Sequence, residues 1–596
     1  MSNVPPMSQF YFPRVCFPSL RLTFTLSLML LTGACSLVQE PVTPVVETVG
    51  AIKLNQLGFL PDAQKRAVVP DTPAKNFSVV DQRSGAAVFN APLGAALEWV
   101  PAQESVKLAN FSEFKTPGKY RIRVKGLADS PPFSISADEY VALNGAVIKA
   151  FYYNRAGMAL TEQFAGVYAR AAGHADTQVL VHASAATQLR PVDTAISAPK
   201  GWYDAGDYNK YVVNSGITTY TLLAAFEHFP DYYAAQNLHI PESGDAVPDL
   251  LNEIFWNLDW MLAMQDPDDG GVYHKLTEKN FSQFVMPSHV NAPRYVVQKT
   301  TAAALNFAAV MAMASRVFAP YNASYPGYSA KMLVAAEKAW VWASRHSAVI
   351  YEQPDDIKTG KYGDNKLSDE FAWAAAELYI ATKNNRYYVA MNSTEVKNTV
   401  PSWSDVRGLA WMSLAQHRTQ LTALADQQLI ASRIDGLAAD LLVKAQSSGY
   451  GVPMQVSDFI WGSNAVAANQ AMMLIQGFRL NGNRQYLDAA QSLLDYLLGR
   501  NATGYSFVTG FGAKPTLHPH HRPSGADAVA APVPGFLVGG PQPDQQDASE
   551  CPVAYPTKIP AKSYVDHECS YASNEVAINW NAPLVYLSGA LQVLTR

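Results

Sequence analysis

The most constraining feature of the chain is a long region, from about Ala137 onward, in which apolar residues recur with helical spacing. Loops rich in Gly, Pro and Asp separate the amphipathic stretches, and no alternating strand pattern falls between them. The stretches cover 139–153, 215–228, 247–264, 299–316, 329–346, 369–382, 403–416, 426–446, 464–480, 484–498 and 576–594. So many helices without strands favour a barrel of paired helices over an α/β sheet. We therefore expect one all-α domain over 137–596.

The region before it, 51–136, has a different pattern. Short alternating apolar runs are broken by turn residues such as Pro117-Gly118, which predicts strands. Three of these runs are Phe77-Ser78-Val79-Val80, Ser105-Val106-Lys107-Leu108 and Tyr120-Arg121-Ile122-Arg123-Val124. The length and pattern indicate a small all-β sandwich of immunoglobulin-like size. Its polar residues have no catalytic spacing, so we interpret it as a structural module.

Residues 1–35 have the pattern of an export signal. Arg14 and Arg21 precede an apolar run over 22–31, and the segment contains no acidic residue. The run ends in Leu-Thr-Gly-Ala before Cys35, which resembles a bacterial lipoprotein signal. It is too short to span a membrane as a helix. Cleavage before Cys35 would free the thiol for lipidation, and the lipid would be the only membrane contact.

Residues 36–50 are predicted to tether the folded chain to this anchor. They contain Pro41 and Pro44 and show no hydrophobic periodicity. Ser36, directly after the cysteine, favours the outer membrane, at the cell surface or on its periplasmic face. The alternative is an ordinary secretory signal with an incidental Cys35, which would give a periplasmic or secreted protein. Both interpretations predict export.

Composition limits the partners. The 45 basic and 50 acidic residues give a formal net charge of -5 with no long run of either sign. This balance argues against binding nucleic acid and favours a neutral substrate. The 11 Trp and 30 Tyr residues suit stacking on sugar rings, although a large core uses them too. We expect a monomer.

Two cysteines remain beyond the export signal, Cys551 and Cys569. They are close in sequence, and an exported protein folds in an oxidising compartment, which favours a disulfide. By loop-closure entropy such a bond would stabilise the fold by about 3 kcal/mol. The alternative is a pair of free buried thiols.

The first chemical motif is Gly-Trp-Tyr-Asp-Ala-Gly-Asp-Tyr-Asn-Lys-Tyr over 201–211. Its carboxylates, Asp204 and Asp207, lie three residues apart between glycines and aromatics. Two such side chains can hold a water between them, as inverting hydrolysis of a glycosidic bond requires. A calcium loop or a helix cap is the alternative for this motif alone.

This motif resembles the base motif of glycoside hydrolase family 9, and two later segments also match that family. Residues 506–522, ending His-Pro-His-His-Arg, resemble its His-x-Arg signature, and Tyr564-Val565-Asp566 with 571–582 resembles its acid signature. The resemblance covers about Ala51 to the C-terminus. It implies an (α/α)6 barrel preceded by an immunoglobulin-like domain.

The resemblance implies that Asp207 is the general base, that Asp204 helps to hold the water, and that Glu575 is the general acid. Glu575 begins the final apolar stretch with no adjacent Lys or Arg. Partial burial there would raise its pKa and keep it protonated for donation. Without the motif, Glu575 would be interpreted as a helix-start acid favoured by the helix dipole.

Sugar binding is predicted from the same resemblance. His520 and Arg522 correspond to the family's sugar-binding pair, and their donors suit vicinal hydroxyls. Four aromatic residues are candidate platforms, with burial in the core as the alternative: Trp461, Trp580, Trp202 and Tyr203.

Calcium is the metal that the resemblance implies, in a structural role, while the chemistry requires no cofactor. Asp266, Asp268 and Asp269 lie in a loop rich in hard oxygen ligands, and Asp369 resembles a ligand position of the family. A solvated turn explains the Asp-rich loop equally well. Zinc held by histidines is disfavoured because no ligand helix surrounds them. The histidines concerned are His518, His520, His521 and His567.

The sequence therefore predicts an inverting hydrolase of β-1,4-glucosidic bonds in cellulose-type glucans or cello-oligosaccharides, an endoglucanase or cellodextrinase. One alternative is an exo-acting β-glucosidase or exo-β-glucosaminidase of the same fold. A remote alternative, a glycan-binding lipoprotein without catalysis, would lack the acid or the base. The longest stretch without helical pattern, 509–566, is expected to shape the cleft.

Overall fold

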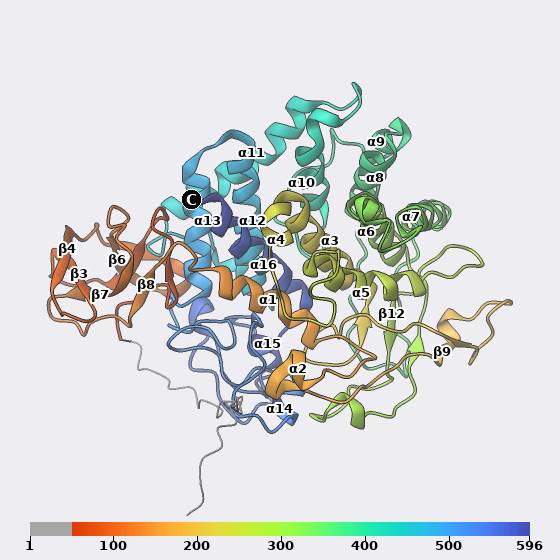
Figure 1. The fold of residues 1–596 in the computed structure, drawn as a ribbon, viewed down its shortest axis with the longest axis horizontal. Helices are drawn as coiled ribbons and strands as arrows, with labels where there is room; N and C mark the ends of the chain where they lie inside the picture. The colour runs from red at the N-terminus through yellow and green to blue at the C-terminus, as the bar shows by residue number, and fades with distance from the viewer. Residues whose placement is uncertain (1–49, 596) are drawn as a thin grey trace, which may run out of the picture. The chain divides into compact units, whose positions relative to one another are not determined.

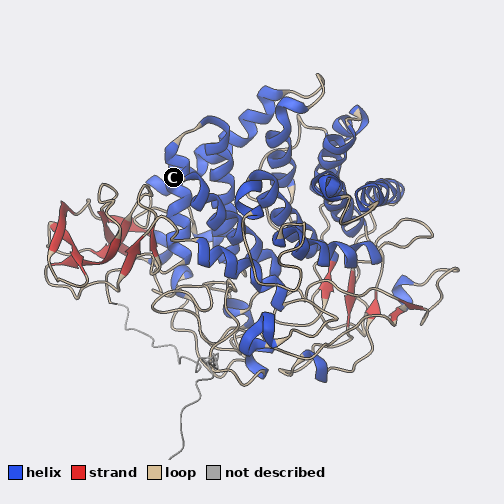
Figure 2. Ribbon diagram, viewed as in Figure 1, coloured by secondary structure: helices blue, strands red, loops and turns tan. Residues whose placement is uncertain are grey.

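The computed structural model describes residues 50–595 (Figure 1). The predicted signal, Cys35 and most of the predicted tether lie outside the described residues. Figure 2 shows two separate groups of strands beside the helices. Along the described chain, the larger group precedes the main helices, and the smaller group falls within the helical region.

The first domain is a β-sandwich of two sheets. One sheet has the strand order β1-β8-β7-β3-β4 and the other β2-β6-β5, and only the β1–β8 pairing is parallel. Phe59, Phe111 and Phe133 pack edge to face or tilted between them, with ring centroids 5.3 to 5.6 Å apart. The strands are β1 (Gly58–Phe59), β2 (Arg66–Pro70), β3 (Asn76–Asp81), β4 (Ala87–Pro92), β5 (Leu97–Trp99), β6 (Glu104–Asn110), β7 (Gly118–Val124) and β8 (Phe133–Ile135).

The second domain is a closed ring of helix pairs. Six inner helices contact one another in the order α16-α3-α6-α8-α10-α12 and back to α16. Each packs against one outer helix: α1 on α16, α5 on α3, α7 on α6, α9 on α8, α11 on α10 and α13 on α12. The second domain is thus an (α/α)6 barrel. Together with the preceding β-sandwich, it confirms the predicted fold class.

The barrel helices are α1 (Val141–Tyr153), α3 (Val212–His228), α5 (Asp249–Ala263), α6 (Thr301–Phe318), α7 (Tyr328–Arg345), α8 (Ser368–Thr382), α9 (Asn385–Met391), α10 (Arg407–His417), α11 (Gln427–Gln446), α12 (Ser463–Asn481), α13 (Arg484–Leu497) and α16 (Ile578–Leu594). Short helices lie in the loops: α2 (Glu162–Ala165), α4 (Pro230–Ala234), α14 (Arg522–Ala526) and α15 (Tyr571–Asn574).

Burial separates inner from outer helices. Inner α3 and α6 are buried around almost their whole circumference, whereas outer α7 and α11 bury one stripe. A helix surrounded by others reads as apolar on all sides, and a peripheral helix keeps a polar face. Helix α6 is long and apolar enough to cross a membrane, but it is buried as an inner helix of the barrel.

Two elements were not predicted from the sequence. Helix α9 is only seven residues long. A small sheet with the order β10-β9-β13-β12-β11 interrupts the helical region. Its strands are β9 (Val179–Val181), β10 (Ala195–Ile196), β11 (Lys210–Tyr211), β12 (Lys275–Thr277) and β13 (Tyr295–Val296). Strands of two or three residues are too short to produce a visible alternation.

The sandwich packs directly on the barrel domain. Trp99, at the end of β5, lies 4.4 Å from the ring of Tyr450, and its indole donates to the Met454 carbonyl at 3.3 Å. Glu104 accepts a hydrogen bond from Tyr450 and pairs with Lys562 at 2.9 Å. The sandwich therefore contacts the long loop that leads to the acid segment.

Candidate active site

Asp204 lies in the loop before α3 and is 1% exposed. Both of its carboxylate oxygens accept hydrogen bonds. Asn214, in the first turn of α3, donates to Oδ1 at 2.7 Å, and the Tyr362 hydroxyl donates to Oδ2 at 2.8 Å. The carboxylate plane is fixed by these two partners.

Asp207 is held through a relay from the small sheet. Its Oδ2 accepts hydrogen bonds from the side-chain amide of Asn209 and from the Asn209 backbone N–H. The Asn209 amide oxygen in turn accepts from the Thr277 hydroxyl and the Glu278 backbone N–H, both at 2.9 Å. Strand β12 thus orients the predicted base through Asn209.

Glu575 lies between α15 and α16 and is partly exposed. Its Oε1 accepts a hydrogen bond from the Gly206 N–H at 3.4 Å, within the loop that carries both aspartates. Its own carbonyl accepts from the Gly539 N–H at 2.8 Å. The predicted acid therefore faces the predicted base loop.

Backbone hydrogen bonds join the three sequence motifs around Gly206. The Ile578 N–H donates to the Asp204 carbonyl at 2.9 Å, and the Arg522 N–H donates to the Gly206 carbonyl at 3.1 Å. The His520 carbonyl approaches so closely that a Cβ on Gly206 would lie 2.2 Å from it. Only glycine permits this approach, so the glycine of the base motif is required by packing.

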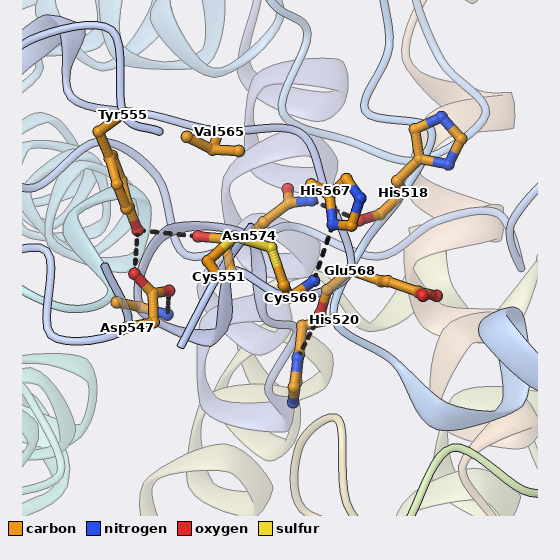
Figure 3. The surroundings of a disulfide bond; sticks show 12 residues. His518, His520, Asp547, Cys551, Tyr555, Val565, His567, Glu568, Cys569 and Asn574 are labelled. Carbon is orange, nitrogen blue, oxygen red and sulfur yellow. Dashed lines mark hydrogen bonds between the residues drawn. A yellow bond between two sulfur atoms is a disulfide. The ribbon is translucent and has the colours of Figure 1, made fainter. Parts of the chain in front are cut away.

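The His-x-Arg pair is anchored to the same loops. Burial lowers the pKa of His520 to about 4, and its Nδ1 bonds the Glu568 carbonyl at 2.6 Å (Figure 3). The ring is therefore neutral, with Nδ1–H as donor and Nε2 available as an acceptor. Arg522 donates through Nη1 to the Gly206 carbonyl and through Nε to the Ser282 carbonyl, both at 2.8 Å. Two nitrogens of Arg522 therefore hold backbone carbonyl groups of the loops around the site.

A row of aromatic rings borders the site. Trp461 is 42% exposed, and its ring lies 5.4 Å from that of Tyr571. Tyr571 lies 6.0 Å from the ring of His520, which in turn meets Phe284 edge to face at 5.0 Å. Trp461 is the exposed ring of this row and offers a face on which a sugar can stack, while His520 meets Tyr571 and Phe284 edge to face.

The platform predictions for the two aromatics beside the base are wrong. Trp202 is fully buried and its indole donates to Glu253 of α5 at 2.8 Å. Tyr203 is also buried, with its hydroxyl 2.8 Å from the Nδ1 of His174. Both belong to the core under the loop. Trp580 is 8% exposed, and its indole packs closely against Gly462 and Gly539.

Cys551 and Cys569 form a disulfide beside this row (Figure 3). It joins the long loop to the segment that leads to Glu575. The Nδ1 of His567 accepts from the Cys569 N–H at 3.1 Å, and its ring lies near both sulfurs. Because the disulfide uses both thiols, this group of three does not favour zinc.

The Asp-rich loop is a network of ion pairs, which corrects its interpretation as a calcium site. Lys299 lies 2.6 Å from Asp266 and 2.9 Å from Asp269, and Arg190 lies 3.2 Å from both Asp266 and Asp268. These cations neutralise the carboxylates, so a divalent ion is not needed there.

Asp369 lies in a different environment. It opens α8 beside Glu370, and Asp364 precedes them in the same segment; all three are buried. Neither carboxylate oxygen of Glu370 has a hydrogen-bond partner, and neither does Oδ2 of Asp364. Buried carboxylates without donors are costly unless a cation is bound or the group keeps its proton, and burial, followed by the Asp369 charge, raises the pKa of Glu370 to about 10.

Electrostatics separates the roles of the catalytic carboxyls. Burial, followed by the charge of Asp207, raises the pKa of Asp204 to about 8. Burial also raises the pKa of Asp207, while the Arg522 charge and the Asn209 hydrogen bonds oppose that rise. Burial and the Asp207 charge hold the pKa of Glu575 well above its usual range. Glu575 is therefore protonated and suited to be the acid, with Asp207 the better-stabilised anion.

Comparison with known proteins assigns both domains to known families. A model of the cellulase N-terminal ig-like domain matches residues 47–129, and the model of glycosyl hydrolase family 9 matches residues 140–588. The chain belongs to glycosyl hydrolase family 9.

Its relatives extend over nearly the whole chain. The chain is 45% identical to a xyloglucan-specific endo-beta-1,4-glucanase of Bacteroides ovatus, over 93% of this chain and 95% of that protein. It is 32% identical to endoglucanase D of Acetivibrio thermocellus, over 90% of this chain and 82% of that protein. A solved family 9 structure from Bacteroides ovatus matches with a TM-score of 0.85 and 42% identity, over 92% of this chain and 99% of that one.

Several residues of this family 9 site escaped the sequence analysis as functional groups. Asn209 and Asn214 orient the aspartates and follow directly after them, so their position was a usable signal. Tyr571 lies within the acid motif. Tyr362 had no signal, because it comes from a loop 158 positions after Asp204. It adopts a φ of 44°, a region that non-glycine residues seldom occupy.

We expect kcat/KM of this hydrolase to follow a bell-shaped pH profile. Activity falls as the pH drops through the raised pKa of Asp207, because the base must be ionised. It falls again as the pH rises through the pKa of Glu575, because the acid must be protonated.

Glu575→Gln should lower turnover of an unactivated glucan by about 10²–10⁴-fold and remove the alkaline limb. Initial rates between about pH 4 and 9 measure both effects. Glu162→Gln, an exposed carboxyl on α2, is the matched control and should leave the profile unchanged. An unaltered alkaline limb in Glu575→Gln would contradict the assignment.

Proposed function

We propose that the chain is an inverting endo-β-1,4-glucanase that accepts a xylose-branched glucan. The observation that carries the proposal is the facing arrangement of a protonated carboxyl, Glu575, and a carboxylate loop, Asp204 to Asp207, beside an aromatic row. Both catalytic groups are in place, which disfavours a binding protein without catalysis.

The mechanism follows from the contacts of each residue. Asp207 takes a proton from a water that Asp204 helps to hold, and the oxygen attacks the anomeric carbon. Glu575 donates its proton to the departing glycosidic oxygen, so bond formation and cleavage occur in a single displacement that inverts the anomeric centre. Asn209, Asn214 and Tyr362 act as positioning residues for the two aspartates.

The relatives support the substrate. The 45% identical protein is named as xyloglucan-specific, while others are named an endoglucanase and a cellodextrinase. A neutral polysaccharide also fits the charge balance and the exposed aromatic row. No cofactor enters the chemistry.

We propose a structural calcium ion at the start of α8. Asp364, Asp369 and Glu370 would hold it with hard oxygen ligands, which matches the unpartnered oxygens of this buried group. The ion would neutralise these charges. It would also fix the segment that carries Tyr362 against Asp204.

We also propose that the protein is exported and anchored in the outer membrane through Cys35, on the basis of the signal-like pattern of residues 1–35. The expected result is labelling of the wild-type protein by a fatty-acid probe and its recovery with membranes. Cys35→Ala should be unlabelled and soluble. Equal labelling of both proteins would contradict lipidation at this residue.

Product analysis tests the proposed reaction. On xyloglucan we expect internal cuts, with oligosaccharides of several lengths early in the digest, because an endo enzyme binds along the chain. Proton NMR of fresh products should show the α-anomer first, because inversion of a β-bond yields it. Release of monosaccharide alone would favour the exo alternative, and early β-anomer would contradict the single displacement.

Calcium removal tests the proposed ion. We expect EDTA to lower the midpoint of thermal unfolding and calcium chloride to restore it, because a ligand at 100 times its Kd stabilises by about 2.7 kcal/mol. Glu370→Gln should abolish the response to EDTA. Asp268→Asn, in the ion-paired loop, should retain it. A midpoint that EDTA leaves unchanged in the wild-type protein would contradict the site.

A further inference from the structure

The loop between β12 and β13 forms an open pocket beside the candidate active site. Antiparallel pairing of Leu276 with Val296 closes the base of the loop, so residues 278–294 project as one unit. The pocket within it has a volume of about 500 Å³. This lies in the range of about 300–1,000 Å³ typical of small-molecule sites, with room for one or two sugar rings.

The wall of this pocket is bonded directly to the sugar-binding pair. The Ser282 carbonyl accepts the hydrogen bond from Arg522 Nε, and the Phe281 ring lies 5.7 Å from the same guanidinium. Phe284, in the same loop, contacts the ring of His520. A glucan unit bound over His520 would thus have the pocket at its side, away from the row of Trp461 and Tyr571.

The loop is also tied to the base motif. Tyr208 follows Asp207 in the chain, and its hydroxyl donates a hydrogen bond to the Val285 carbonyl at 2.6 Å. Glu278, whose backbone N–H helps to orient Asn209, lines the pocket as well. The pocket therefore has a defined position relative to the scissile bond.

The lining has the chemistry of a site for a neutral sugar. Phe281 is 47% exposed and offers an aromatic surface, while Tyr295 is partly exposed with the Lys279 ammonium over its ring. Gln283, His289 and Asn291 add amide and imidazole groups that can both donate and accept hydrogen bonds.

The charges around the pocket have partners or are buried. Lys279 pairs with Asp356 at 2.8 Å and lies over the Tyr295 ring. Glu278 is 3% exposed, and its Oε1 lies 3.3 Å from His174 Nε2 and 3.6 Å from Arg294 Nη1, so this carboxylate has buried partners. The balanced charges around the pocket therefore do not favour a charged ligand.

We propose that this pocket receives a xylosyl branch carried on O6 of a glucosyl unit next to the scissile bond. The inference rests on the proposed endoglucanase function and adds the site that distinguishes a branched from an unbranched chain. An unbranched glucan lies along the aromatic row and leaves the pocket unused.

Paired substrates test the proposal. Gln283→Ala/Asn291→Ala and, separately, Phe281→Ala should lower kcat/KM on xyloglucan about tenfold, the order expected for losing one aromatic or hydrogen-bond contact. On unbranched mixed-linkage β-glucan the double variant should change less than about twofold. Val389→Ala, an exposed position on α9, is the control and should change neither.

Equal losses on both glucans, or no loss on xyloglucan, would overturn the pocket assignment. Binding separates this failure from failure of the proposed function, because it does not need turnover. In a Glu575→Gln background, calorimetry should show a xylose-branched cellotetraose binding about tenfold more tightly than cellotetraose. The double substitution should remove that difference. Equal affinity of the two oligosaccharides for the Glu575→Gln protein would refute the pocket even if the enzyme cleaves glucans.

Discussion

The site depends on a close approach of three backbone segments at Gly206. The acid lies 369 positions after this glycine in the chain, yet the Gly206 N–H reaches its carboxylate. The Gly206 carbonyl accepts from both the backbone and the guanidinium of Arg522. These are short, directional contacts that fix relative position better than apolar packing does. Catalysis by opposed carboxyls needs such a frame, because a displacement of about 1 Å can cost about 100-fold in rate.

Burial then gives these carboxyls different tasks. All three lose hydration, and each compensates differently: Asp207 through Arg522 and Asn209, Asp204 through Asn214 and Tyr362, and Glu575 by retaining its proton. In the second set of buried acids, neither oxygen of Glu370 has a hydrogen-bond partner, although Asp369 accepts from the Val406 N–H and Asp364 from the Lys366 N–H. The same physical cost therefore points to proton transfer in one place and to a cation in the other.

The fold class was predictable from helical periodicity, and the three candidate catalytic carboxyls, which the structure brings together, were predictable from short contiguous motifs. The sequence did not indicate partners supplied by distant elements. Trp202 beside the base looked like a sugar platform, but Glu253 of α5 makes it a core residue. The Asp-rich loop was interpreted as a calcium site because its cationic partners, Lys299 and Arg190, come from distant positions in the chain. Tyr362 reaches Asp204 from a loop 158 positions later in the chain, and the pocket depends on the path of the 278–294 loop, which no sequence pattern indicates.

The closure of the helical ring has a consequence for when activity can begin. Helix α16 contacts α3 and α12 and so completes the inner ring, and the acid immediately precedes this helix. The residues that hold the water are synthesised hundreds of positions earlier. A growing chain therefore carries an incomplete site until its final barrel helix has emerged and docked. With Glu575 as the proposed acid, hydrolysis is coupled in this way to completion of the fold.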